Sequence, residues 1–166
     1  MTAQRIFKLL GVLLLSAVIL ALVAPGALYK TSLALLPRYP STPVAMAITP
    51  KERRAWVSAG GDSIYQSRDI PPMAMEQLDP WSVTWHFLFR CKSNSGSSAD
   101  LHYCVYYFPG YMPAAEAADR HFRSLGFPGN PTLWQGISQT ALAIWITRHW
   151  SPQQVAAYLA STEKLR

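Results

Sequence analysis

An uncharged apolar run, Leu9–Tyr29, lies between Lys8 and Lys30 and constrains this chain more than any other feature. An α-helix rises 1.5 Å per residue, so roughly 20 apolar residues are enough to cross the hydrocarbon core of a bilayer. The sequence therefore predicts a single transmembrane helix over residues 9–29, preceded by a tail of residues 1–8.

A cleaved signal peptide is the alternative interpretation of this run. Arg5 and Lys8 precede an apolar stretch of signal-peptide length, as they would in a secreted protein. However, no small-x-small pair of residues closes the run before a cut after Ala24 or Ala27. The sequence favours a retained anchor, so we expect the lipid bilayer to be a partner of the protein.

Charge and cysteine usage together predict the orientation of the chain. The two basic residues before the run and the amino terminus slightly outweigh Lys30 and Arg38 after it, which favours a cytoplasmic tail. The only two cysteines, Cys91 and Cys104, both follow the run, and a disulfide between them suits a periplasmic or extracellular compartment. Two buried free thiols are the alternative. No C-x-x-C or H-x-x-x-H spacing indicates a metal site, and we expect no cofactor.

The part of the chain beyond the run is long enough for one domain with a modest core. Prolines at positions 37, 40, 43 and 50 predict an extended stalk over residues 30–50, which leaves residues 51–166 as the body. From Lys30 onward, thirteen Lys and Arg residues face nine acidic residues, so the part of the chain beyond the apolar run carries about +4. Because these cations are scattered, and the compartment is wrong for it, we expect no nucleic-acid partner; anionic lipids or wall polymers are more suitable neighbours.

Capping signals predict a mainly helical body. We expect helices over residues 50–58, from Pro113 to about Leu125, over residues 132–149, and after the capping box Ser151-Pro152-Gln153-Gln154. The sequence of residues 81–108 is compatible with two different structures. Asp79-Pro80 would begin a helix, but Trp81, Val83, Trp85 and Phe87 also alternate as in a strand, so an α+β fold with a disulfide-tied hairpin at 81–108 is the alternative.

Residues 132–157 carry a resemblance to a known family. They read TLWQGISQTALAIWITRHWSPQQVAA. This segment is similar to one in the biosynthetic peptidoglycan glycosyltransferases, the family 51 transglycosylases that polymerise lipid II, which reads approximately TLWRKLREALLALQLERRYSKDEILE. The residues that pair with identical or similar ones are Thr132, Leu133, Trp134, Leu142, Ala143, Arg148, Trp150, Ser151 and Val155. Asp79-Pro80 resembles the family's GxDPxxxxRAL stretch, and SGSSADL resembles its GGSTITQQ loop.

The resemblance implies a small lysozyme-like helical domain behind the membrane helix. It also implies that the protein binds lipid-linked glycan or peptidoglycan synthase partners, with Arg148, Trp134 and Trp150 as the ligand-binding residues. An anchored partner-binding or structural module of an envelope complex, without glycan chemistry, is the alternative.

The chain departs from the family where chemistry is concerned. Arg68 in one alignment, or Lys51 in another, stands in place of the catalytic Glu of the Glu-Asp-x-x-Phe signature, and only the second acid is matched, by Asp69 in the first alignment. Gln135 and Gln139 stand where the RKxxE motif has a cation and an acid. Glycosyl transfer needs a general base and cations on the leaving pyrophosphate, so we expect a catalytically impaired relative whose catalytic residues are unknown.

Two further groups of residues have simpler interpretations. Glu116 and Arg120, like Asp119 and Arg123, are spaced i to i+4 and are expected to form solvated surface ion pairs. The aromatic side chains over residues 81–111 are expected to pack the core, with a glycan platform or a membrane-interface belt as the alternative.

Overall fold

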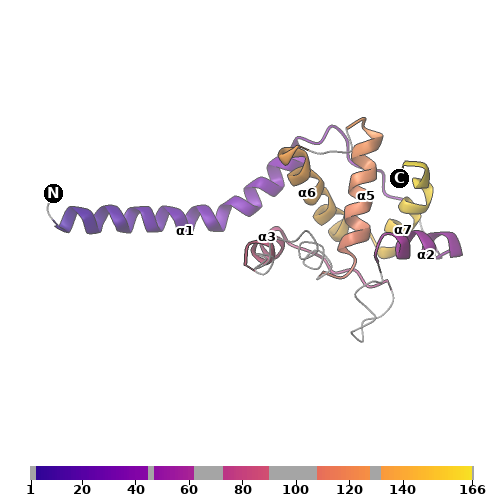
Figure 1. Ribbon diagram of the computed structural model, residues 1–166, viewed down its shortest axis with the longest axis horizontal. Helices are drawn as coiled ribbons and strands as arrows, with labels where there is room; N and C mark the ends of the chain where they lie inside the picture. Colours follow the sequence, from indigo (N-terminus) through magenta and orange to yellow (C-terminus); the bar gives the residue numbers. More distant parts are fainter. Residues whose placement is uncertain (1–2, 45–46, 62–72, 90–107, 128–131, 166) are drawn as a thin grey trace, which may run out of the picture.

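The computed structural model describes residues 3–44, 47–61, 73–89, 108–127 and 132–165, and these are helical and irregular, with no strand among them (Figure 1). The helices are α1 (Ala3–Ala34), α2 (Pro50–Ser58), α3 (Pro80–Phe89), α5 (Tyr111–Ser124), α6 (Leu133–His149), α7 (Pro152–Ser161) and the short 3-10 helix η2 (Glu163–Leu165). A membrane-length helix followed by a helical body is the architecture that the sequence predicts.

The first helix is longer than the predicted transmembrane segment. Residues Leu10–Ala34 are apolar enough to cross a membrane, and α1 continues to Ala34 instead of ending at Tyr29. Pro25 lies inside it, and Figure 1 shows α1 changing direction in its last third. Proline has no amide hydrogen and its ring displaces the carbonyl of the preceding turn, which accounts for the bend. Beyond the bend, Ser32 and Leu33 are buried in the body.

The segment after α1 lies along the body instead of forming a free stalk. The carbonyl oxygen of Arg38 is 2.8 Å from Nε2 of His121 on α5. The Tyr39 ring lies 5.0 Å from that of Trp145 on α6, and its hydroxyl donates to the carbonyl of Leu33. The prolines thus prevent a helix here, as expected, but side chains on both sides attach the segment to α5 and α6.

Capping motifs begin the short helices where the sequence predicts. Thr49 and Glu52 form a complete capping box on α2, and Ser151 and Gln154 form one on α7. Each box satisfies the first backbone amides of a helix that is too short to be stable by propensity alone. The two helices then pack on each other.

The core lies where α5 crosses α6 and α7 (Figure 1). Ala114, Ala117 and Ala118 on α5 are fully buried, and their small side chains let the two backbones approach closely. Leu142 and Ile146 of α6 fill the other side of this contact. Helix α6 is central to the body, since it contacts both α1 and α5.

Two expectations are corrected. Residues 80–89 form a helix, so the hairpin alternative is wrong for its first strand; Oδ1 of Asp79 accepts hydrogen bonds from the amides of Trp81 and Ser82, which favours the helix. Helix α5 begins at Tyr111, two residues before the expected start at Pro113, after Gly110 with φ of 74°. Cys91 and Cys104 lie outside the described residues.

Candidate functional site

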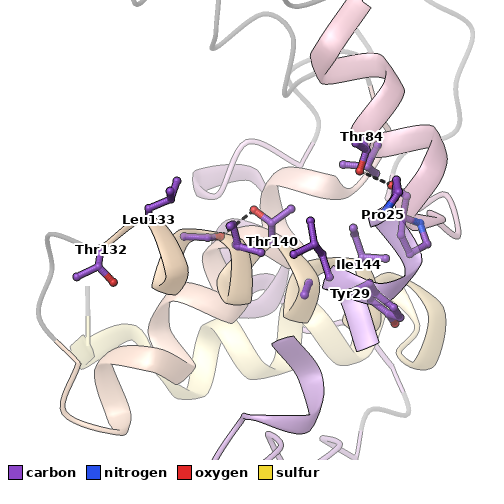
Figure 2. Close-up of a pocket in the computed structure, with 13 residues that line it drawn as sticks. Pro25, Tyr29, Thr84, Thr132, Leu133, Thr140 and Ile144 are labelled. Carbon is purple, nitrogen blue, oxygen red and sulfur yellow. Dashed lines mark hydrogen bonds between the residues drawn. The ribbon is translucent and has the colours of Figure 1, made fainter. Parts of the chain in front are cut away.

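A groove of about 560 Å³ lies between α1, α3 and α6 (Figure 2). Its volume falls within the roughly 300 to 1,000 Å³ of small-molecule sites. The residues that line it, none of them charged, are Pro25, Leu28 and Tyr29 of α1, Pro80, Val83 and Thr84 of α3, and Thr132, Leu133, Gly136, Ile137, Thr140, Ala141 and Ile144 of α6 with its cap. One wall of the groove is therefore the candidate membrane helix.

Trp81 holds this wall in place. Its indole Nε1 donates a 2.7 Å hydrogen bond to the carbonyl of Leu22, in the turn that Pro25 disturbs. A Cβ built on Gly26 would lie 2.7 Å from Cζ2 and Cη2 of the same indole, closer than carbon atoms normally approach. The missing side chain of Gly26 thus makes room for the indole, and α3 docks on the bend of α1. In the sequence, Pro25 and Gly26 only interrupt an apolar run. The contact with Trp81 could therefore not be predicted from the sequence.

The three threonine hydroxyls of the groove have backbone partners. The hydroxyl of Thr84 donates to the carbonyl of Pro80 at 2.6 Å, and that of Thr140 donates to the carbonyl of Gly136 at 3.0 Å (Figure 2). The hydroxyl of Thr132 accepts from the amide of Gln135 as part of the α6 capping box. Because each hydroxyl already has a backbone partner, these threonines present mainly methyl groups to the groove. The surface that remains suits hydrocarbon better than sugar.

The α6 side of the groove has room for an occupant. Nothing lies within 4 Å of a Cβ built on Gly136, which is about midway along the lining residues of α6. At the start of α6, the Leu133 side chain is 84% exposed. Figure 2 shows Leu133 at one end of the row and Ile144 close to Tyr29 at the other. The groove is thus open near Leu133 at the start of α6, and α1 bounds it at the end near Ile144.

A cation follows the groove on α6. Arg148 is exposed and lies one turn beyond Ile144, so the two side chains are neighbours on the helix surface. Burial works to raise the pKa of Asp79, but hydrogen bonds from Ser82 and Trp81 and the nearby positive charge of Arg148 together lower it. Arg148 and the ionised Asp79 therefore lie near one another where α3 begins.

The structure does not bring the three predicted ligand-binding residues together. Trp134 is exposed in the first turn of α6, whereas Arg148 is in its last turn. Fourteen residues of helix separate these two positions, which corresponds to roughly 21 Å. Trp150 is only 4% exposed and packs against Trp145 and Tyr158, so it belongs to the core. Its Nε1 has no hydrogen-bond partner within the described part of the chain.

The residues that align with catalytic positions have structural roles. Oε1 of Gln135 accepts from the amide of Thr132 at 2.7 Å and closes the α6 capping box. Nε2 of Gln139 donates to Asp119 on α5 at 3.3 Å. Glu52, the acid next to Lys51, caps α2 by accepting a 2.7 Å hydrogen bond from the amide of Thr49. None of these three side chains lines the groove.

One of the two expected surface ion pairs is buried. Arg120 and Glu116 are 2.8 Å apart as predicted, but the Arg120 side chain is only 3% exposed and also donates to the carbonyl of Leu159 at 2.7 Å. Arg120 thus satisfies a carbonyl near the end of α7, where helices lack amide partners. The pair between Arg123 and Asp119 lies nearer the surface, as expected.

Two more polar hollows lie beside α2. One is bordered by Glu116, Asp119 and Gln139, and the other by Lys51, Arg54 and Arg120. Most of these side chains have partners within the fold, such as the 3.8 Å contact between Lys51 and Glu163. In the described part of the chain, no three His, Cys, Asp or Glu side chains gather as metal ligands would.

No protein-family model matches the chain, and no curated protein or solved structure is significantly similar to it. The likeness to peptidoglycan glycosyltransferases stays a prediction from the sequence.

Proposed function

We propose that the protein is a membrane-anchored binding module that holds the hydrocarbon chain of an anionic, lipid-linked molecule in the groove between α1, α3 and α6. The observation that carries this proposal is the apolar groove with the candidate membrane helix as one wall. A lipid in the same bilayer would reach the groove sideways, without passing through water. Transfer of apolar surface between bilayer and groove then costs little, so recognition rests on shape and on the headgroup.

Arg148 gives the site its preference for an anionic headgroup. It follows Ile144 at the end of the groove, and a phosphate there would pair with its guanidinium in competition with Asp79. The resemblance to lipid II polymerases points to a lipid-linked glycan, a molecule with a long polyprenyl chain joined to sugars through pyrophosphate. The chain would occupy the groove, and the sugars would lie outside it.

No glycosyl transfer is expected at this site. Catalysis of that reaction needs a carboxylate to deprotonate the attacking hydroxyl, and a positioned base contributes roughly a hundredfold to ten-thousandfold in rate. The groove has no acidic lining residue, and Glu52 is held in a helix cap. The proposal is thus binding, storage or presentation of the lipid-linked molecule.

A binding titration on the full chain in detergent micelles tests the proposal. The probes are a polyprenyl phosphate, the uncharged polyprenol and a soluble sugar phosphate. We expect saturable binding of the polyprenyl phosphate, weaker binding of the polyprenol, and no binding of the sugar phosphate. No saturable binding of either polyprenyl compound would refute the proposal.

Gly136 provides a matched pair of variants for this titration. Gly136→Phe should place a ring in the groove and weaken binding by at least about tenfold, a loss of 1.4 kcal/mol. Gly136→Ala adds a methyl group in open space and should leave the affinity nearly unchanged. Both changes favour the helix, so a loss of binding cannot be attributed to unfolding of α6.

A polymerisation assay with lipid II separates the remaining alternatives. We expect no glycan strands. Strands that disappear in Glu52→Gln or Glu76→Gln would instead identify an active enzyme. If neither product nor binding is detected, the protein is better explained as a partner-binding module of an envelope complex.

A further inference from the structure

We propose that α3 lies in the outer interface of the membrane that α1 crosses, with the stripe Trp81, Trp85 and Phe89 facing the lipid. This inference concerns how the body sits on the bilayer and does not depend on whether the groove binds a lipid.

The contact between Trp81 and α1 sets the depth of α3. The indole of Trp81 reaches Leu22 and Gly26, and both residues lie inside the candidate membrane span Leu10–Ala34. Ser32 and Leu33 are already buried in the body, so the membrane boundary is placed at Tyr29, the end of the predicted span. Leu22 and Gly26 precede Tyr29 by seven and three residues, which is roughly 10 and 5 Å along the helix axis. Interfacial helices bury their apolar face by a similar depth, roughly 5 to 10 Å. Figure 1 shows α3 beside α1 on the side of the body where α1 enters, and α2 on the far side.

The side chains of α3 suit this position. Trp81, Trp85 and Phe89 are spaced i, i+4 and i+8, and the rings of Trp85 and Phe89 stack at 5.2 Å. Phe89 is 72% exposed and Trp81 is 40% exposed, whereas Val83 is buried against the body. Tryptophan is enriched at the boundary between headgroups and acyl chains, where its amphipathic ring is well solvated. A bilayer that covers α3 would remove these exposed rings from water.

The polar groups of α3 do not oppose immersion. The helix contains no Lys, Arg, Asp or Glu, and its one basic residue, His86, packs edge-on against the ring of Phe108 at 5.0 Å. The hydroxyl of Thr84 and the indole amide of Trp81 both donate to backbone carbonyls. The hydroxyl of Ser82 donates to Asp79, whose carboxylate caps the start of the helix. Polar groups that already have partners cost little to transfer out of water.

Spin labelling of the full chain in liposomes tests the inference. Nitroxides at Phe89→Cys and at Val57→Cys, an exposed apolar position on α2, are compared with both native cysteines changed to Ser. Oxygen concentrates in the bilayer and a nickel chelate stays in water. We expect the ratio of their collision rates with the label to be several-fold higher at position 89 than at position 57. Equal ratios at the two positions would overturn the proposal.

A second measurement keeps the native cysteines. Lipids brominated near the glycerol end of the acyl chain quench tryptophans at the interface. We expect Trp85→Phe to remove part of this quenching, and Trp56→Phe, which changes an indole buried on α2, to leave it in place. Quenching that is the same in the wild type and in Trp85→Phe would contradict an immersed α3, even if the cysteine-free protein failed to fold.

Discussion

Two ion pairs with the same i to i+4 spacing are expected to contribute differently to the free energy of unfolding. Arg120 and Arg123 both pair with an acid four residues earlier on α5, yet the Arg120 side chain is 3% exposed and that of Arg123 is 39% exposed. The spacing predicts both pairs, but only tertiary packing distinguishes them. α7 covers Arg120 and gives its guanidinium a second acceptor, the carbonyl of Leu159.

Arg120→Met should therefore be much more destabilising than Arg123→Met. Hydrogen bonds to charged groups contribute about 1.5 to 3 kcal/mol, and we expect Arg120→Met to lower the free energy of unfolding by about 2 kcal/mol. The exposed pair contributes roughly 0 to 1 kcal/mol, so Arg123→Met should change it little. Urea unfolding in micelles, followed by tryptophan fluorescence, measures both. Equal losses would show that burial of Arg120 does not matter.

Asp79 makes the start of α3 sensitive to acid. Hydrogen bonds from Ser82 and Trp81 and the charge of Arg148 outweigh the effect of burial, so its pKa is lower in the folded protein than its ordinary value of 3.8. The stabilisation is complete above about pH 4 to 5 and is lost as the pH falls through the lowered pKa. Asp79→Ala should cost about 1 kcal/mol at pH 7, and this difference should shrink as the pH falls below 4.

Asp79→Asn is the control for charge. It keeps a capping oxygen, so its stability at pH 7 should stay close to that of the wild type, with less dependence on pH below 4. If Asp79→Ala is equally destabilising at pH 2 and pH 7, ionisation of Asp79 is not involved.

At the scale of elements, α3 is joined to α1 at one bend. Pro25 and Gly26 come together in the sequence, and Trp81 arrives from a helix that begins more than fifty residues later. The contact combines a hydrogen bond to Leu22 with a surface that only glycine leaves open. It also sets the angle between two of the three groove walls.

Gly26→Ala should separate α3 from α1. The new methyl group would meet the Trp81 ring at 2.7 Å, and overpacking of this kind costs about 1 to 3 kcal/mol. Gly11→Ala is the matched control, since nothing lies within 4 Å of a Cβ there. In a Trp81→Ala background, Gly26→Ala should lose most of its cost, which a double-mutant cycle of thermal unfolding measures. A Gly26→Ala variant no less stable than Gly11→Ala would refute the contact.

At the scale of the whole molecule, a membrane-length helix continues directly into the fold of the body. The last third of α1 packs on α3 and α6, and residues 35–44 then lie along α5 and α6. The membrane-length helix and the body therefore share one hydrophobic interior. The anchor is expected to position the groove as well as to retain the protein at the membrane.

The orientation of the body is testable by cysteine labelling. With Cys91 changed to Ser, we expect Cys104 in intact spheroplasts to react with a membrane-impermeant reagent. Reaction only after permeabilisation would place the body in the cytoplasm.

The predicted disulfide has its own test. Mass spectrometry of the protein purified without reductant should show a mass two hydrogens below that of the reduced chain. Two thiols that alkylate freely in protein isolated from the envelope would show that Cys91 and Cys104 are not bonded.

Local signals in the sequence determined where most of these helices are. The apolar run, the capping boxes at Thr49, Thr132 and Ser151, and Asp79-Pro80 each act within one or two turns, so they can be recognised without knowing the fold. The packing between helices depends on contacts between distant parts of the chain. Only the tertiary structure showed that Trp81 fits Gly26, that Trp150 is buried, and that the groove lies beside the candidate membrane helix. The spacing of residues along a helix predicts which side chains share a face, but it does not predict which other part of the chain packs against that face.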